Sequence, residues 1–353
     1  MSYYKLYLLF LHLLKVIMVP KVKAATISNV TFVRPAKFYF SGFSNIPHVT
    51  YFLIFLCFAY IMTVVGNVFL MSVIYLVRTL HSPKYMIVFN LALADLCGST
   101  ALIPKVLDVF LFDRSDIVYE ACLSYMFFFY FFTDVQAWTL VIMAYDRFIA
   151  ICFPLRYHSI VTKPAIAAML LFVWVVLMSI SACIVGLLDH HSFCGSLAIQ
   201  SFFCEMRTMR GMACGDTSLI SNIAFVSFVL NPCLPPILIA LTYICIAIAL
   251  SRIASRKERL KAAKTCTSHL ILVAICFSPL LYDNLISDID RDGRIICNVL
   301  PGIVPPLLNP ILYSLKTEEV MNSIKKLCNN MLSNITMSKK VFTAMLTKWK
   351  VLK

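Results

Sequence analysis

The hydrophobic pattern of the chain consists of seven long apolar stretches separated by shorter polar segments. A transmembrane helix needs about 20 predominantly apolar residues, whereas a strand of a membrane barrel needs only about 10 residues of alternating polarity. All seven stretches are long and continuously apolar, and they cover Tyr51–Val77, Tyr85–Leu107, Cys122–Ile149, Ile166–Leu188, Leu219–Leu250, Leu270–Ile286 and Ile295–Leu315. The pattern therefore predicts an all-α membrane protein, a bundle of seven transmembrane helices.

The segments on either side of these stretches have a different character. Tyr3–Val19 is apolar, but it is too short and too charged to be a span. Thr317–Leu327 has the pattern of a short amphipathic helix lying on the membrane. We therefore divide the chain into an extracellular segment at 1–48 (signal-like or a gene-model extension), a seven-helix domain at 49–328 and a basic cytoplasmic tail at 329–353.

Composition and charge support a membrane protein. The chain is 61% hydrophobic and 14% charged, against roughly 45–50% and about 25% for soluble domains. Its net charge of +14 does not indicate nucleic-acid binding, because the basic residues gather in alternate short loops. Such loops face the cytoplasm, which places the N-terminus outside and makes Asn29-Val30-Thr31 a glycosylation motif on the correct side.

Few polar residues interrupt the apolar stretches, and ionisable residues inside a membrane are functional candidates by default. Asp95 lies in the second stretch; the alternative to a functional role is a packing residue satisfied by Asn67 and Asn309. Asp134 lies in the third stretch, and it either contacts a ligand or bonds internally to Asn231 or Ser227. The sequence contains no nucleotide-binding loop, metal cluster or nucleophile elbow, so we expect neither catalysis nor a cofactor.

Two further residue types suggest specific structural features. Pro232, Pro235 and Pro236 predict a kinked fifth span, and Pro279 a hinge in the sixth. Four cysteines lie on the extracellular side, where disulfides can form. They are Cys122 at the start of the third span and Cys194, Cys204 and Cys214 in the loop after the fourth. Four cysteines allow three pairings.

Several motifs together resemble those of olfactory receptors, a branch of the rhodopsin-like G-protein-coupled receptors. Met143–Tyr157 reads MAYDRFIAICFPLRY, and Lys261–Leu270 reads KAAKTCTSHL. The loop Leu80–Met86 (LHSPKYM) also resembles that family, with a leaning towards its fish members. Asn309–Tyr313 has the Asn-Pro-x-x-Tyr pattern at the end of the seventh span. The resemblance extends from about residue 38 to residue 327.

The resemblance implies sites at both ends of the bundle. A small odorant is expected in the outer half, among spans three, five, six and seven, on Phe129, Tyr130, Thr133, Asp134, Ser227, Asn231, Leu280 and Asn284. The expected activation switch comprises Asp146, Arg147, Tyr243, Phe277, Pro279, Asn309, Pro310 and Tyr313. On activation Tyr243 swings inward, the sixth span moves outward, and Arg147 leaves Asp146 to help form the G-protein site. The loop cysteines are expected to pair as Cys122–Cys204 and Cys194–Cys214.

The resemblance also implies partners and a location. The partners are an odorant, a stimulatory olfactory-type G protein that raises cyclic AMP, and membrane lipid; nucleic acid is not among them. The location is the plasma membrane, in sensory cilia. In the family, a sodium ion lies between the second-span Asp, here Asp95, the seventh-span Asn, here Asn309, and a third-span Glu. Gln136 replaces that Glu in this chain, so the site lacks one charge.

Two other classes of protein share parts of this pattern. A rhodopsin-like receptor for an amine or a peptide would share Asp146-Arg147 and Asn309–Tyr313, but not Lys261–Leu270 or the three loop cysteines. A channel or transporter would share the apolar spans. It should also show repeated halves or several intramembrane charges, and the sequence has neither.

Overall fold

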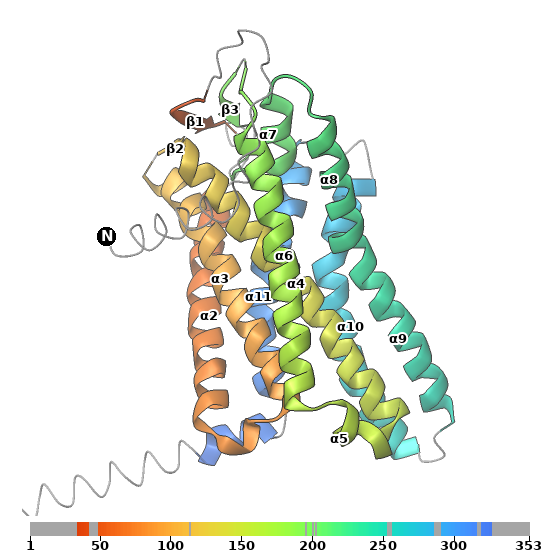
Figure 1. Ribbon diagram of the computed structural model, residues 1–353. Coiled ribbons are helices and arrows are strands. Elements are labelled where there is room, and N and C mark those ends of the chain that lie inside the picture. Colours follow the sequence, from red (N-terminus) through yellow and green to blue (C-terminus); the bar gives the residue numbers. More distant parts are fainter. Residues whose placement is uncertain are drawn as a thin grey trace, which may run out of the picture.

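The computed structural model describes residues 34–41, 49–112, 114–194, 196–199, 201, 203–252, 256–285, 291–315 and 319–326. The predictions made for the first 33 residues, including Asn29, and for the tail after residue 326 therefore lie outside the described residues. Figure 1 shows a bundle of long helices running in the same general direction, with short strands and α7 (Met206–Met212) at one end and α5 (Tyr157–Ile160) at the other.

Within the described residues, seven helical spans form the bundle, which confirms the predicted fold class. They are α2 (Val49–Leu76), α3 (Pro83–Leu111), α4 (Tyr119–Cys152), α6 (Lys163–Asp189), the continuous unit α8 (Ser218–Phe228), η3 (Val229–Cys233) and α9 (Leu234–Ser251), then α10 (Arg256–Leu285) and α11 (Arg291–Leu315). The first five spans are long and apolar enough to cross a membrane, and the last two contain shorter apolar parts, His269–Tyr282 and Val299–Tyr313. Residues 319–326 form the expected short helix after the seventh span.

The third span lies at the centre of the bundle. α4 packs against α3, α6, α9, α10 and α11, and at 34 residues it is the longest single helix among the described elements. Its inward side chains belong to the apolar clusters at both ends and in the middle of the bundle. Groups at the two ends of the bundle are therefore connected through one rigid element.

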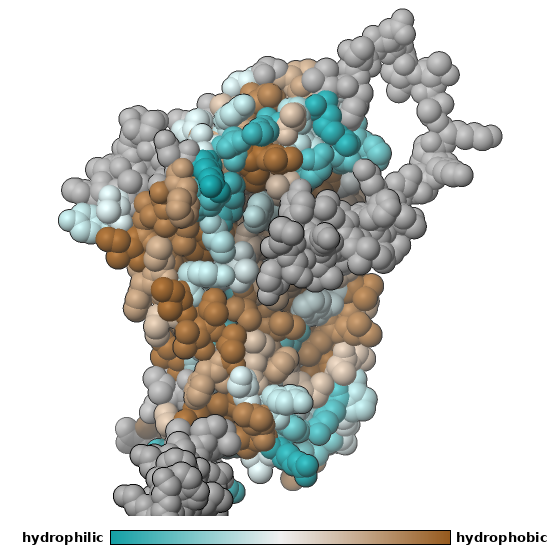
Figure 2. Space-filling model, turned by 90° about the vertical axis from the view of Figure 1, so that its left-hand side faces the viewer, coloured by the Kyte–Doolittle hydropathy of each residue, from teal (hydrophilic) through white to brown (hydrophobic). Residues whose placement is uncertain are grey.

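The outward faces of the helices carry large apolar side chains. Phe58, Ile61 and Phe172 are among those more than half exposed. Figure 2 shows brown, hydrophobic residues across the middle of one face and more teal, hydrophilic residues towards its two ends. In water such a surface would drive association, whereas in a bilayer it matches the lipid chains.

The end of the bundle at which α4 begins carries a small sheet that the hydrophobic pattern did not predict. Its strands are β1 (Lys37–Phe40), β2 (Asp116–Val118) and β3 (Ala198–Ile199), with β1 in the centre, antiparallel to β2 and parallel to β3. Phe38 of β1 is fully buried, and its ring centroid lies 5.8 Å from that of Tyr119 and 5.4 Å from that of Phe193. The sheet thus joins residues that precede the first span to the start of α4.

Three shorter elements complete the loops. η1 (Arg78–Leu80) connects the first two spans, and η2 (Pro154–Arg156) and α5 (Tyr157–Ile160) follow the third. α7 (Met206–Met212) lies in the loop after the fourth span. In the fifth span, for which the prolines predicted a kink, the helix is interrupted by the π-helical turn η3, which contains Pro232. A π turn inserts one extra residue and changes the direction of nearby side chains, which matters for the cavity described next.

Candidate ligand cavity and its connection to the cytoplasmic face

A cavity of about 530 Å³ lies in the outer half of the bundle, within the range of roughly 300–1,000 Å³ that is usual for small-molecule sites. It is bordered by α4, α6, α8, η3, α10 and the segment at α7. Its lining residues are Met126, Phe127, Phe129, Tyr130, Thr133, Asp134, Ala137, Ser181, Ile184, Val185, Glu205, Met206, Arg207, Arg210, Ser221, Ala224, Phe225, Ser227, Phe228, Asn231, Pro232 and Leu280. The walls are mainly apolar, with a few polar groups.

Seven of the eight residues predicted as ligand contacts line this cavity. They are Phe129, Tyr130, Thr133, Asp134, Ser227, Asn231 and Leu280. The side chain of the eighth, Asn284, lies outside the described part of the structure. The structure thus brings together residues of the third, fifth and sixth spans that are far apart in the sequence.

The helices around the cavity differ from the expected set in two respects. α6, the fourth span, supplies Ser181, Ile184 and Val185, whereas α11, the seventh, supplies none of the described lining residues. Phe129 explains the second difference, because its ring fills the space in front of α11. A Cβ atom placed on Gly302 of α11 would lie only 2.9 Å from Phe129 Cε2.

Asp134 has a defined internal partner at the inner end of the cavity. Its Oδ2 accepts a hydrogen bond from Asn231 Nδ2 at 2.8 Å, and the same amide nitrogen donates to Ser227 Oγ at 3.2 Å. Trp138 Nε1 donates to Asn231 Oδ1 at 3.3 Å. Because an indole N–H can only donate, this bond orients the Asn231 amide with its nitrogen towards Asp134. Asn231 belongs to the π turn η3. The internal partner considered from the sequence is therefore present.

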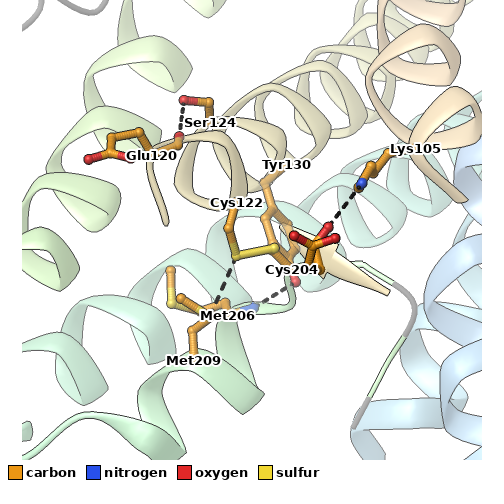
Figure 3. The surroundings of a disulfide bond; sticks show 9 residues. Lys105, Glu120, Cys122, Ser124, Tyr130, Cys204, Met206 and Met209 are labelled. Atoms are coloured by element: carbon orange, nitrogen blue, oxygen red, sulfur yellow. Dashed lines mark hydrogen bonds between the residues drawn. A yellow bond between two sulfur atoms is a disulfide. The ribbon is translucent and has the colours of Figure 1, made fainter. Parts of the chain in front are cut away.

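Two disulfides hold the loop after the fourth span over the cavity. The structure joins Cys122 to Cys204, with Cα atoms 5.5 Å apart, and Cys194 to Cys214, with Cα atoms 5.7 Å apart, which is the pairing implied by the resemblance. Figure 3 shows the first bridge beside Tyr130 and Met206. The backbone N–H of Met206 donates to the Tyr130 hydroxyl at 3.4 Å. The loop thus contacts α4 next to the cavity.

The cavity residues from this loop were not predicted from the sequence. Glu205, Met206, Arg207 and Arg210 directly follow Cys204 and line the cavity. The Cys122–Cys204 pairing was the feature of the sequence that could have identified them. A disulfide between Cys204 and the start of α4 must bring the next few residues over that end of the helix. No comparable feature of the sequence identified Ser181, because helix packing decides which face of α6 points into the bundle.

A buried polar centre connects the second and seventh spans. Asp95 is fully buried, and its Oδ2 accepts a hydrogen bond from Asn309 Nδ2 at 2.7 Å. Asn67 does not take the expected part in this contact: its amide donates to the backbone oxygens of Thr63 at 2.9 Å and Pro306 at 3.0 Å. Asn309 is therefore the hydrogen-bond partner of Asp95 Oδ2, while Asp95 Oδ1 is buried without a hydrogen-bond partner among the described residues.

The donor set at Asp95 does not match the two-carboxylate sodium site of the family. Gln136 Nε2 donates to the backbone oxygen of Ala94 at 3.3 Å, so its amide nitrogen is turned towards α3. Asp95 is left as the one carboxylate beside Asn309, which lowers the negative charge available to a cation. Among the described residues, no group of three His, Cys, Asp or Glu side chains is placed to hold a metal ion.

The end of α4 that carries Asp146 and Arg147 differs from the arrangement expected at rest. Asp146 Oδ1 accepts a hydrogen bond from the Tyr157 hydroxyl at 2.7 Å, and within the described residues Asp146 and Arg147 form no ion pair. Burial and the hydrogen bond to Asp146 raise the pKa of Tyr157, so this hydroxyl stays protonated and donates. Tyr157 therefore holds Asp146 and leaves the Arg147 guanidinium available for a partner.

The remaining switch residues lie on the inner faces of α9, α10 and α11. The Tyr243 hydroxyl lies 2.9 Å from His269 Nδ1, and the Tyr313 hydroxyl lies 3.4 Å from Met143 Sδ. Phe277 is buried, and Pro279 lies inside α10, which continues through it. Pro310 packs against Gly66, where an added Cβ would lie 3.0 Å from Pro310 Cβ. Tyr243 thus already points into the bundle, where the resemblance places it after activation.

The short helix at 319–326 is attached to the start of α3. Glu319 accepts a hydrogen bond from the Tyr85 hydroxyl, and its Oε2 lies 3.7 Å from Lys84 Nζ. The hydrogen bond from Tyr85 holds the pKa of Glu319 below its usual value, so this carboxylate stays ionised at neutral pH. Val320 is buried beside these contacts. The helix is therefore fixed to the bundle by both polar and apolar contacts.

Comparison with known proteins shows which family this sequence resembles. A family model described as olfactory receptor matches residues 56–331. Mouse (Mus musculus) olfactory receptor 8G17 is 32% identical over 295 residues, covering 82% of this chain and 96% of the relative. Human (Homo sapiens) olfactory receptor 5K4 is 34% identical over 298 residues, covering 84% and 92%. Human olfactory receptor 1J1 is 34% identical over 270 residues, covering 76% and 84%.

Proposed function

The chain belongs to the olfactory receptor family, and on this basis we propose that it binds a small odorant in the cavity beside α4 and activates a stimulatory heterotrimeric G protein, which raises cyclic AMP. Membership of this receptor family also means that the protein is not an enzyme. The observation that carries the proposal is the cavity of about 530 Å³, lined by aromatic and polar side chains of several spans.

The proposed mechanism depends on the third, fifth and sixth spans, which all border the cavity. An odorant shifts an existing equilibrium towards the active state when it binds that state more tightly. It would contact Asp134 and Asn231, and Asn231 lies in the π turn of the fifth span. It would also contact Leu280, which follows Pro279 in α10. Both helices continue to the cytoplasmic end, where Tyr243 and His269 meet.

We place the receptor in the plasma membrane of sensory cilia, with its N-terminus outside and its C-terminus in the cytoplasm. The acidic residues Asp108, Asp116 and Asp189 lie at the end that carries the disulfides, whereas Arg78 and Arg156 lie in the loops at the other end. This distribution of charge supports the orientation.

Filling the cavity tests the proposal. Ala224→Phe adds a ring to a residue that lines the cavity, so it is expected to exclude the odorant and lower its potency in a cyclic AMP assay by about tenfold or more, equivalent to about 1.4 kcal/mol. Val226→Phe is the matched control, because Val226 lies on the same helix and is 53% exposed. Equal responses from both variants, at equal surface levels, would refute a ligand site in this cavity.

A further inference from the structure

Asp134 is the one carboxylate at the inner end of the cavity, away from the loop. The other cavity carboxylate, Glu205, belongs to the loop, as do Arg207 and Arg210. Tyr130 meets this loop at Met206, and Asp134 lies four residues further along α4, which corresponds to about 6 Å along the helix axis. The charged groups of the loop and Asp134 therefore lie at different depths.

The internal contacts of Asp134 leave part of its hydrogen-bonding capacity unused. Within the described residues it forms no ion pair, and its one hydrogen-bond partner is Asn231, which donates to Oδ2. An ionised carboxylate has room for about four hydrogen bonds. The side chain is only partly buried and lines the cavity. Its remaining acceptor positions are accordingly within reach of a bound ligand.

The surroundings of Asp134 favour a positively charged ligand group. The neighbouring cavity walls are largely apolar, including Phe127, Phe129, Phe228 and Leu280. A carboxylate in such surroundings is costly unless a charged partner and hydrogen bonds compensate for its desolvation. The internal amide of Asn231 supplies a hydrogen bond but no charge. A ligand cation would supply both.

We propose that the ligands of this receptor are small protonated amines whose ammonium group binds Asp134 and whose apolar body lies against the aromatic walls of the cavity. The proposal rests on the proposed function, since it names the chemical class of the odorant. Asn231, held by Trp138 and Ser227, positions the Asp134 carboxylate for this contact. An anionic ligand bound by Arg207 and Arg210 is the opposite outcome, which the experiment below distinguishes.

The test measures binding directly and separately from signalling. Purified full-length receptor is heated with a panel of amines that have linear, cyclic or aromatic apolar bodies, and with the alcohol and the carboxylic acid of each skeleton. At least one amine is expected to raise the unfolding temperature more than its alcohol and its acid. Asp134→Asn retains an oxygen acceptor for Asn231 and removes the charge, so it should weaken amine binding by about tenfold or more.

A control variant and the possible outcomes distinguish a failure of the inference from a failure of the proposed function. Asp216→Asn removes an exposed carboxylate outside the cavity, and it should leave amine binding unchanged. Stabilisation by acids or alcohols in preference to every amine, or equal amine binding by the wild type and Asp134→Asn, would overturn the inference. If amines bind through Asp134 but no amine raises cyclic AMP, the inference stands and the proposed function fails.

Discussion

Replacing Cys204 with serine is expected to lower the free energy of unfolding by roughly 2–5 kcal/mol, the usual cost of losing a native disulfide, and to reduce the receptor at the cell surface. The bridge to Cys122 joins positions 82 residues apart, whereas the Cys194–Cys214 bridge joins positions 20 residues apart. In the chain-entropy description the longer loop gives the larger effect, by about 1 kcal/mol. The Cys204 variant should therefore be less stable than Cys214→Ser.

Thermal unfolding of the purified variants and surface labelling of cells provide the measurements. Cys183→Ser is the matched control, because Cys183 is free and exposed, and it should be close to the wild type. The double variant Cys122→Ser/Cys204→Ser should be no less stable than the worse of the two single variants, since one bond is lost in each case. Additive losses in the double variant would contradict the pairing.

Replacing Asn309 with alanine is expected to cost roughly 1.5–3 kcal/mol, the range for a hydrogen bond to a charged group. The substitution removes the Asn309 amide, which donates to Asp95 Oδ2 at 2.7 Å. The fully buried Asp95 side chain then lacks this hydrogen bond. Thermal unfolding of the purified receptor would measure the loss. Asn222→Ala, at an exposed position of α8, serves as the control and should change stability by no more than about 0.5 kcal/mol.

A second variant shows whether the effect comes from this contact. If the cost comes from the stranded charge, Asp95→Asn should remove much of it, so Asp95→Asn/Asn309→Ala should be less destabilised than the sum of the two single variants. Strict additivity would mean that Asn309 acts through another neighbour and that the hydrogen bond to Asp95 has little effect on stability.

The transmembrane helices could be predicted closely from the sequence because a continuous apolar run of this length is a strong signal. The first span was expected at Tyr51–Val77 and is Val49–Leu76. The sixth was expected to begin at Leu270, but α10 begins at Arg256. Its first turns carry Lys257, Arg259 and further polar residues, which hydropathy cannot distinguish from a loop, although a helix can extend beyond the membrane.

The small sheet could not be predicted for a different reason. Its strands are two to four residues long, too short for an alternating pattern to be recognised. Their pairing depends on Phe38, which becomes buried only when the N-terminal segment, the loop after α3 and the loop after α6 meet. Contacts of that kind are made between distant parts of the chain and leave no local pattern.

Part of the candidate site could be predicted from helical spacing along the sequence, whereas the rest depends on how the helices pack. Counting helical turns from Arg147 placed Phe129, Tyr130 and Asp134 in the outer half of the third span, and the structure places all three on the cavity. The contribution of α6 and the orientation of Asn231 depend on helix packing and on the π turn at Val229–Cys233. The partner of Asp146 is likewise set by the fold of the second cytoplasmic loop, which brings Tyr157 to it.

The most direct test of the account is the cyclic AMP response of cells that express the receptor, challenged with pooled odorants that include amines, with Arg147→Ala alongside. Arg147 has no ion pair with Asp146 in the described residues, and in this account it contacts the G protein. The wild type should respond, and Arg147→Ala should not respond at an equal surface level. Arg78→Ala, which removes an exposed cytoplasmic charge, should respond like the wild type. An unchanged response in Arg147→Ala would contradict the account.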